Sequence, residues 1–266
     1  MKTFAAALTG LGLVVLAGSA AAQTPQRQFE ATYTVIARGV SAGDFVYRFN
    51  QTGDTYQASA TRRLTGLARS LMGDRQDYSY STRGAVAANG ALQPAAYTHR
   101  GGRRNRVVNA AFTAEDVTTT AEPAMGMGNP PATLAQRRNT VDQITAIASM
   151  VTASGDPCAR TIRVYMDGRS RFDFVLTPNG RVEVNTSAYR GQALRCRVEF
   201  RPIAGFSDPQ ETEVLTFLFA PTPSGMYAPV RIEMPTDDAG IARLEARRLS
   251  VNGPSAAVDR AVAAAR

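Results

Sequence analysis

The chain of 266 residues contains no tryptophan, one histidine (His99) and one lysine (Lys2). A zinc site usually takes three or four clustered histidine, cysteine or carboxylate ligands, so one histidine disfavours such a site. Catalysis by a serine or cysteine nucleophile needs a nearby base, which is usually histidine. His99 has no catalytic motif around it, and a lone histidine on a strand is more often a surface residue. We therefore predict no catalytic residue, no metal site and no cofactor.

Apolar runs of membrane-spanning length are missing. The N-terminus has a basic start (residues 1–3), an apolar stretch (residues 4–16) and three alanines (residues 20–22), which is typical of a cleaved secretory signal. We expect residues 1–22 to be removed and the mature chain to reach the periplasm as a soluble protein without a transmembrane segment. No cysteine lies at the expected cut between Ala22 and Gln23, so we expect no lipid anchor.

Only two cysteines are present, Cys158 and Cys196. An even number of cysteines in an oxidising compartment favours a disulfide over two free thiols. The bridge would close a loop of about 39 residues and stabilise the fold by about 3–4 kcal/mol in the chain-entropy model.

The mature chain would carry 29 arginines against 22 acidic residues, a net charge of +7. Such a protein is attracted to anionic envelope surfaces, although a coding bias towards arginine and alanine is the favoured explanation of the excess. The densest basic run contains Arg100, Arg103, Arg104 and Arg106. These residues are candidates for anion binding, and a solvated hairpin tip is the favoured alternative. Aromatic residues are not interleaved with them, so we expect no nucleic-acid partner.

Alternation of apolar and polar residues recurs along most of the chain and predicts strands with one buried face. Strands are expected near residues 29–35, 43–50, 55–63, 76–83, 97–112, 213–219, 227–234 and 241–251. Residues 122–139 are rich in proline and glycine and predict a loop. Its Met125 and Met127 could line a pliable lid over a pocket, although packing within the loop is favoured. The one clear helix is expected at residues 141–152, with Thr140 and Gln143 at capping-box spacing. Asp142 is a further candidate for capping.

The strongest strand pattern runs from about residue 161 to 201. Asp167-Gly168 and Asn179-Gly180 favour the positive φ of tight hairpins, so we predict a meander of four strands. Cys158 precedes the first of these strands and Cys196 lies in the fourth. In a flat sheet they would be about 14 Å apart, whereas a disulfide needs Cα atoms within about 7 Å. Either the sheet curls or the segment before residue 162 folds back.

These patterns together predict a mostly β fold. Residues 23–252 would form a single domain, one strongly curved antiparallel sheet (open and barrel-like) with one principal α-helix packed on its concave face. Residues 253–266 are rich in alanine and would form a tail.

Several short segments, in their order along the chain, resemble an exported bacterial family described as domain of unknown function 3108. They are Tyr33–Val35 with Gly39 and Gly43, Thr140–Ile144, Val164–Arg169, the Cys196 strand through Ala204–Phe206, and Ala228–Ile232. The resemblance implies an envelope protein with no established activity, and it supplies no catalytic residues. By architecture alone the chain is also similar to curved-sheet periplasmic proteins that shelter lipid or act in envelope integrity.

Three functions remain open. The leading hypothesis is a non-catalytic periplasmic protein that holds a lipid, another apolar ligand or an envelope partner on the curved sheet. A second is a carboxylate-dependent hydrolase of envelope glycans. Its candidate pairs are Asp74 with Asp77, Asp167 with Asp173, and Glu211 with Glu213, although solvated turns or strand edges are favoured for each. A third is a purely structural module that binds another envelope protein.

Overall fold

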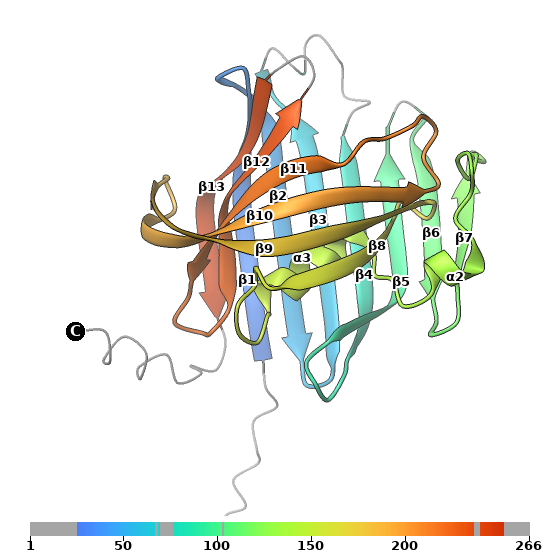
Figure 1. Cartoon of the computed structure of the whole chain (residues 1–266), viewed down its shortest axis with the longest axis horizontal. Helices are drawn as coiled ribbons and strands as arrows, with labels where there is room; N and C mark the ends of the chain where they lie inside the picture. Colours follow the sequence, from blue (N-terminus) through green and yellow to red (C-terminus); the bar gives the residue numbers. More distant parts are fainter. Residues whose placement is uncertain (1–25, 67–68, 70–76, 103, 237–239, 253–266) are drawn as a thin grey trace, which may run out of the picture.

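The computed structural model describes residues 26–66, 69, 77–102, 104–236 and 240–252 (Figure 1). The expected signal at residues 1–22, the expected tail at 253–266 and the candidate residues Arg103 and Asp74 lie outside the described residues. The strands are β1 (Gln26–Ala37), β2 (Val40–Thr52), β3 (Thr55–Leu64), β4 (Tyr78–Val86), β5 (Leu92–Gly101), β6 (Arg106–Phe112), β7 (Val117–Glu122), β8 (Arg160–Met166), β9 (Ser170–Asn185), β10 (Arg190–Ala204), β11 (Glu213–Pro221), β12 (Tyr227–Thr236) and β13 (Gly240–Asn252). The helices are α2 (Leu134–Arg137) and α3 (Gln143–Val151).

The strands follow the alternation in the sequence. In β1, Phe29, Ala31 and Tyr33 are buried, whereas the intervening Glu30 is exposed. The β1–β2 turn is built from Arg38 and Gly39, both at positive φ, as a two-residue hairpin requires. Each buried side chain therefore removes apolar area from water while its polar neighbour stays solvated.

All thirteen strands form one antiparallel sheet in the order β7-β6-β5-β4-β3-β2-β1-β13-β12-β11-β10-β9-β8. β1 pairs with β13, so the first and last strands lie side by side in the middle of the sheet. The sheet does not close, because no described ladder joins the edge strands β7 and β8. We call the gap between β7 and β8 the seam. The prediction of a mostly β fold with one open antiparallel sheet is confirmed.

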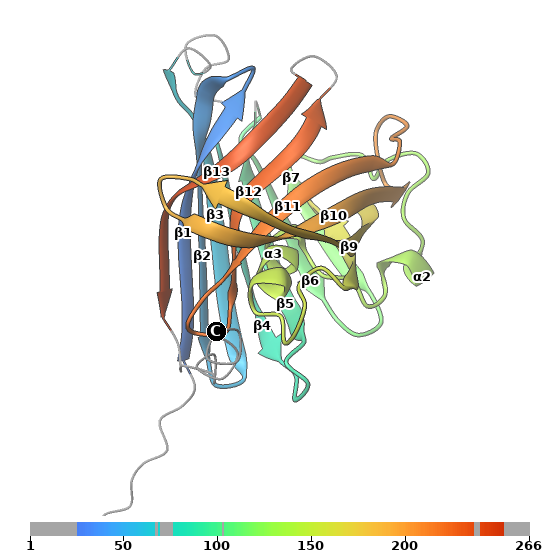
Figure 2. The same ribbon diagram turned by 60° about the vertical axis from the view of Figure 1, so that its left-hand side comes forward.

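Helix α3 lies between two groups of strands. It contacts β3, β4 and β5 on one side and β8 and β12 on the other, and Figures 1 and 2 show it between the crossing strands. Its placement on a concave face of a strongly curved sheet stays a prediction. Among the described residues, no helix is long and apolar enough to cross a membrane.

The start of α3 differs from the predicted capping box. Asp142 is the N-cap, and its Oδ1 accepts hydrogen bonds from the backbone N–H groups of Ile144 and Thr145, both at 2.9 Å. Thr140 instead donates its hydroxyl to the carbonyl of Arg137. Val141 exchanges backbone hydrogen bonds with β8, which keeps that residue extended. The helix therefore begins at Gln143, two residues later than predicted. The predicted box was therefore wrong, and the candidate Asp142 takes the role.

The predicted four-strand meander is a three-strand one. Asn179-Gly180 makes no hairpin, because both residues lie within the long strand β9 opposite the single residue Arg195 of β10. Gly180 keeps the expected positive φ of 79°. This backbone conformation suits a β-bulge as well as a tight turn, so the dipeptide alone could not distinguish them.

The expected disulfide between Cys158 and Cys196 is present, with the Cα atoms 5.2 Å apart. Cys196 pairs with Pro178 of β9, and Cys158 comes just before β8, the strand on the other side of β9. Two strand spacings in a flat sheet would be about 9.6 Å. The segment before β8 must therefore fold back over β9, which was one of the two predicted solutions.

Candidate functional site

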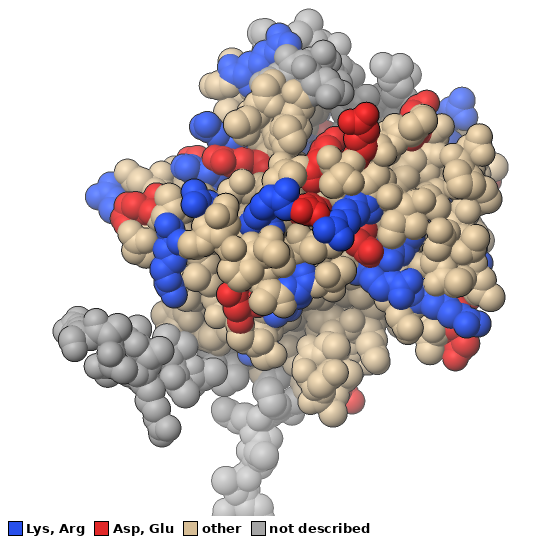
Figure 3. Space-filling view, in the orientation of Figure 1, with Lys and Arg blue, Asp and Glu red and all other residues tan. Residues whose placement is uncertain are grey.

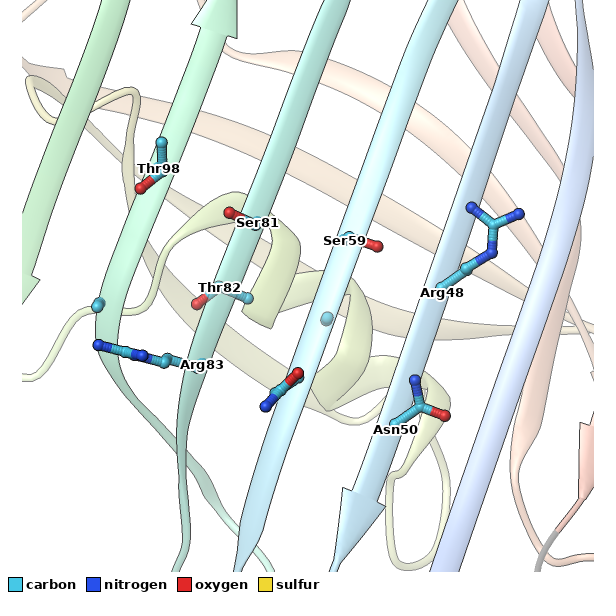
Figure 4. A pocket seen from close by; sticks show the side chains of 10 residues that line it. Arg48, Asn50, Ser59, Ser81, Thr82, Arg83 and Thr98 are labelled. Atoms are coloured by element: carbon cyan, nitrogen blue, oxygen red, sulfur yellow. The ribbon is translucent and has the colours of Figure 1, made fainter.

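The outer face of β2–β5 carries an open polar depression of about 500 Å³ (Figure 4). Arg48, Ser59, Ser81 and Thr98 are directly opposite one another on successive strands and form one row of its floor. Arg48 pairs with Glu30 of β1 at 3.1 Å. No buried polar atom without a hydrogen bond lies among the lining residues. This depression has the character of the solvated face of a half-buried sheet.

A second depression, which we call the seam pocket, lies where β4–β6 meet the β8–β9 turn. Its volume is about 430 Å³. Its lining comes from four separate parts of the chain: Tyr78, His99, Gly101, Gly102, Arg104, Arg106, Val108, Met125, Asp167 and Arg169. The pocket therefore unites the only histidine with part of the densest basic run, although sequence reasoning had treated them separately.

The basic run forms the turn between β5 and β6. Arg104 and Arg106 line the seam pocket. Arg100 follows His99 on β5, so its side chain points to the opposite face of the sheet. Gly102 has a positive φ of 77°, and a Cβ there would lie 3.0 Å from the hydroxyl of Tyr78. The turn thus passes close over Tyr78, and glycine is needed for that approach.

His99 is buried, with 8 % of its surface exposed, so the predicted surface position was wrong. Alternation along β5 places it on the same face as buried Tyr97, and the β8–β9 turn covers that face. The rings of Tyr78 and Tyr80 stack against it at centroid distances of 5.3 and 5.0 Å. These contacts fix the orientation of the imidazole.

Asp167 occupies the tight β8–β9 turn with a positive φ of 50°. Its Oδ1 accepts hydrogen bonds from the Tyr97 hydroxyl at 2.8 Å and the Gln143 amide at 2.6 Å, and it lies 3.2 Å from His99 Nδ1. Burial raises the pKa of this carboxyl, but the His99 ring and the hydrogen bonds outweigh burial and hold the pKa below its usual value.

The ring nitrogens of His99 lack hydrogen bonds. Nδ1 contacts Asp167 Oδ1 at 3.2 Å without the alignment of a hydrogen bond, and neither Nδ1 nor Nε2 has a hydrogen-bond partner within the described residues. Buried polar atoms without partners are rare in folded proteins and call for an explanation. Here the unpartnered ring lines a pocket.

Two arginines of the seam pocket are held in place by the loop after β7. Arg106 donates Nε to the carbonyl of Pro123 at 2.7 Å and Nη2 to that of Ala124 at 3.1 Å. Arg169 donates Nη1 to the carbonyl of Gly126 at 3.3 Å. Met125, for which packing within the loop was favoured over lining a pocket, lines the pocket.

Among the carboxylate pairs proposed for hydrolysis, the members that the structure describes do not share a pocket. Asp77 accepts a hydrogen bond from the backbone of Leu64, and Asp173 pairs with Arg171 at 2.7 Å. Of the described carboxylates, Asp167 lines the seam pocket, and none lines the depression on β2–β5 or the three other surface depressions found. The part of the chain that the structure describes also holds no group of three or more potential metal ligands.

Charge on the face formed by β9–β11 is mixed, as Figure 3 shows. On β10, Glu199 forms ion pairs with both Arg197 and Arg201, and these guanidinium groups lower the pKa of its carboxyl. This face therefore does not form one continuous basic surface, although the chain has an excess of arginine.

Comparison with known families identifies the chain. The model of a protein family of unknown function, DUF3108, matches residues 28–247. The chain belongs to the DUF3108 family. The predicted family is thus confirmed.

Two solved structures are similar to this DUF3108 chain over most of their length. One is described as a putative exported protein with a YmcC-like fold from Bacteroides fragilis, with 14 % identity, a TM-score of 0.35, and coverage of 86 % of this chain and 96 % of the other. The second is described as a putative lipoprotein from Parabacteroides distasonis, with 9 % identity, a TM-score of 0.33, and coverage of 85 % and 95 %. No curated protein gives a significant match.

Proposed function

We propose that this DUF3108 protein is a non-catalytic periplasmic binding protein that holds an envelope ligand in the seam pocket. The observation that carries the proposal is the buried His99, whose ring nitrogens have no hydrogen bonds, in a pocket built from four separate parts of the chain. A binding site gains affinity when its groups are already ordered, and the stacked histidine and anchored arginines meet that condition.

The lining residues favour binding over catalysis. The pocket contains no serine, threonine or cysteine beside His99, so the imidazole has no nucleophile to activate. Its one carboxylate, Asp167, is occupied by Tyr97 and Gln143. A glycosidase uses two carboxyl groups flanking the bond, which this pocket does not offer.

A ligand site beneath the helix is less well supported. Tyr47 and Tyr56 extend from the sheet to α3, and their hydroxyls bond the Ile144 carbonyl at 3.0 Å and the Thr145 hydroxyl at 2.8 Å. Both tyrosines are at most 2 % exposed. Side chains therefore fill this space, and we place the ligand of the leading hypothesis in the seam pocket.

Export to the periplasm without a lipid anchor is part of the proposal. It rests on the basic and apolar N-terminal pattern, on the absence of a cysteine near residue 22, and on the disulfide, which persists in oxidising compartments.

An envelope partner is the second candidate. Val40 is 61 % exposed and Ile241 is 55 % exposed. The antiparallel pairing of β1 with β13 places both at the same end of the sheet. Exposed apolar residues at one end are a feature of protein contact sites.

Native mass spectrometry of protein purified from the periplasm tests the binding function. We expect a small-molecule adduct that unfolding releases. The variant Met125→Trp, which fills part of the pocket, should lower its occupancy, whereas Met127→Trp, two residues away and outside the lining, should not. Well-folded protein that repeatedly carries no adduct would count against the proposal, as would equal occupancy in the two variants.

A further inference from the structure

We propose that the seam pocket recognises a phosphate group, and that an apolar body attached to this group contacts the rest of the lining. The inference rests on the binding function proposed above and names the ligand chemistry of that site.

Positive groups converge on the pocket from three places. Arg104 comes from the β5–β6 turn, Arg106 from β6 and Arg169 from the β8–β9 turn. The only carboxylate in the lining, Asp167, already accepts hydrogen bonds from Tyr97 and Gln143. The lining therefore has more cationic than anionic groups, and its cations are guanidiniums, which bind phosphate through paired N–H donors.

The arginines keep donors available for a ligand. Arg106 uses Nε and Nη2 for backbone carbonyls, and Arg169 uses Nη1. Within the described residues, Nη1 of Arg106, Nε and Nη2 of Arg169 and the whole guanidinium of Arg104 have no hydrogen-bond partner. Two of the three cations are thus oriented in advance, which reduces the entropy lost on binding.

His99 is the second, independent sign of a ligand. Its side chain is nine-tenths buried and lines the pocket, yet both ring nitrogens lack hydrogen bonds. When the imidazole is protonated, Nδ1–H lies beside Asp167 and Nε2–H remains as a donor. A phosphate oxygen would satisfy that donor and add a charge-assisted hydrogen bond.

The remaining lining residues are apolar or aromatic. Tyr78, Val108 and Met125 border the same pocket. Free phosphate would leave this surface uncovered, whereas a phosphate ester with an alkyl chain would bury it. The favoured source of the phosphate is therefore an amphiphile, and inorganic phosphate is the competing source.

Calorimetric titration of the tag-free, disulfide-bonded mature chain distinguishes these cases. The probes are octyl phosphate, octyl glucoside as a neutral matched amphiphile, and inorganic phosphate. We expect octyl phosphate to bind at least about tenfold more tightly than octyl glucoside, because one charge-assisted hydrogen bond is worth about that factor. It should also bind at least about tenfold more tightly than inorganic phosphate, because its alkyl chain buries the apolar part of the lining. Added salt should weaken the binding of octyl phosphate more than that of octyl glucoside, since only the phosphate is charged.

Variants assign the effect to the pocket. Arg104→Gln and His99→Phe should each weaken octyl phosphate about tenfold or more. Arg100→Gln is the matched control, because it removes the same charge from the same run on the opposite face of the sheet. It should change the affinity less than about twofold. Far-UV circular dichroism confirms that each variant is folded.

Each result has a distinct meaning. Tight binding of inorganic phosphate alone would keep the phosphate site and overturn the amphiphile. Equal binding of octyl glucoside, unaffected by Arg104→Gln, would overturn phosphate recognition and leave the binding function standing. If none of the probes binds while purified protein still carries an adduct that Met125→Trp removes, the phosphate inference fails and the proposed function survives.

Discussion

The molecule contains two clusters of buried polar side chains that differ in how completely they are satisfied. Beneath α3, Asp142 accepts four hydrogen bonds, including the hydroxyls of Thr82 at 2.8 Å and Thr145 at 2.7 Å. At the seam, Asp167 accepts two hydrogen bonds, both on Oδ1, and the neighbouring His99 has two nitrogens without hydrogen bonds. A saturated network stabilises a fold. An incomplete one beside a pocket indicates a place for a ligand.

The largest expected effect on folding stability comes from removing Asp142, the acceptor of the fully hydrogen-bonded cluster. Asp142→Ala removes the helix cap and leaves the hydroxyls of Thr82 and Thr145 without their acceptor. A lost cap costs about 1 kcal/mol and a buried unsatisfied group about 1–3 kcal/mol. We expect urea denaturation to show about 2–3 kcal/mol lower stability. A loss below about 0.5 kcal/mol would contradict the structural role of the cluster.

A smaller effect is expected where the seam is closely packed. Gly168 has a φ of +68°, and a Cβ there would lie 2.4 Å from Cγ2 of Thr119. Gly168→Ala should cost about 1–2 kcal/mol through backbone strain and this clash. Adding Thr119→Ala should recover the part due to the clash. If the second substitution recovers nothing, β7 and the β8–β9 turn are not in contact as described.

The two carboxyls should respond to pH in opposite directions. Burial raises the pKa of Asp142 in the folded state, so its contribution is fully present below the unfolded pKa of about 3.9 and declines as the pH rises through the folded value. The pKa of Asp167 is lowered, so its contribution is lost as the pH falls. The amide in the variant Asp142→Asn cannot ionise, so the variant does not lose stability as the pH rises. The stability of the variant relative to that of the original chain should therefore improve between pH 4 and 8. The slope cannot exceed about 1.4 kcal/mol per pH unit, and a constant difference across this range would contradict the raised pKa.

The smallest effect on stability is expected at His99. His99→Phe keeps an aromatic ring against Tyr78 and Tyr80. It removes two nitrogens that have no hydrogen bonds, together with the contact of Nδ1 with Asp167 at 3.2 Å. Replacing an unsatisfied buried polar group by an apolar one is nearly neutral or stabilising. Thermal unfolding should show an unchanged or slightly higher midpoint. A loss above about 1 kcal/mol would mean that the nitrogens stabilise the fold, as in the Asp142 cluster.

The local alternation of apolar and polar residues was sufficient to predict most of the strands from the sequence. Alternation identified β1 and β2 because one face of each is buried and the other is wet. β7 was missed because its sequence, Val-Thr-Thr-Thr-Ala-Glu, has little apolar contrast. Asn179-Gly180 was misread because its backbone preference fits both a turn and a bulge.

The seam pocket could not be predicted from local patterns. His99 and Asp167 are far apart in the sequence, and they meet only because the β8–β9 turn reaches the face of β5. The Asp167-Gly168 turn was visible in the sequence, and alternation already placed Tyr97 and His99 on one face. What the sequence lacked was any signal that these features face each other.

The chain has a single histidine, so the nitrogen NMR spectrum of its imidazole reports on His99 alone. This measurement tests the central claim, that a ring nitrogen of His99 without a hydrogen bond binds the ligand. In tag-free, isotope-labelled protein, we predict that octyl phosphate shifts the ring resonances, that Arg104→Gln weakens the response, and that Arg100→Gln leaves it unchanged. Ring resonances that stay in place while calorimetry shows octyl phosphate bound would contradict the account.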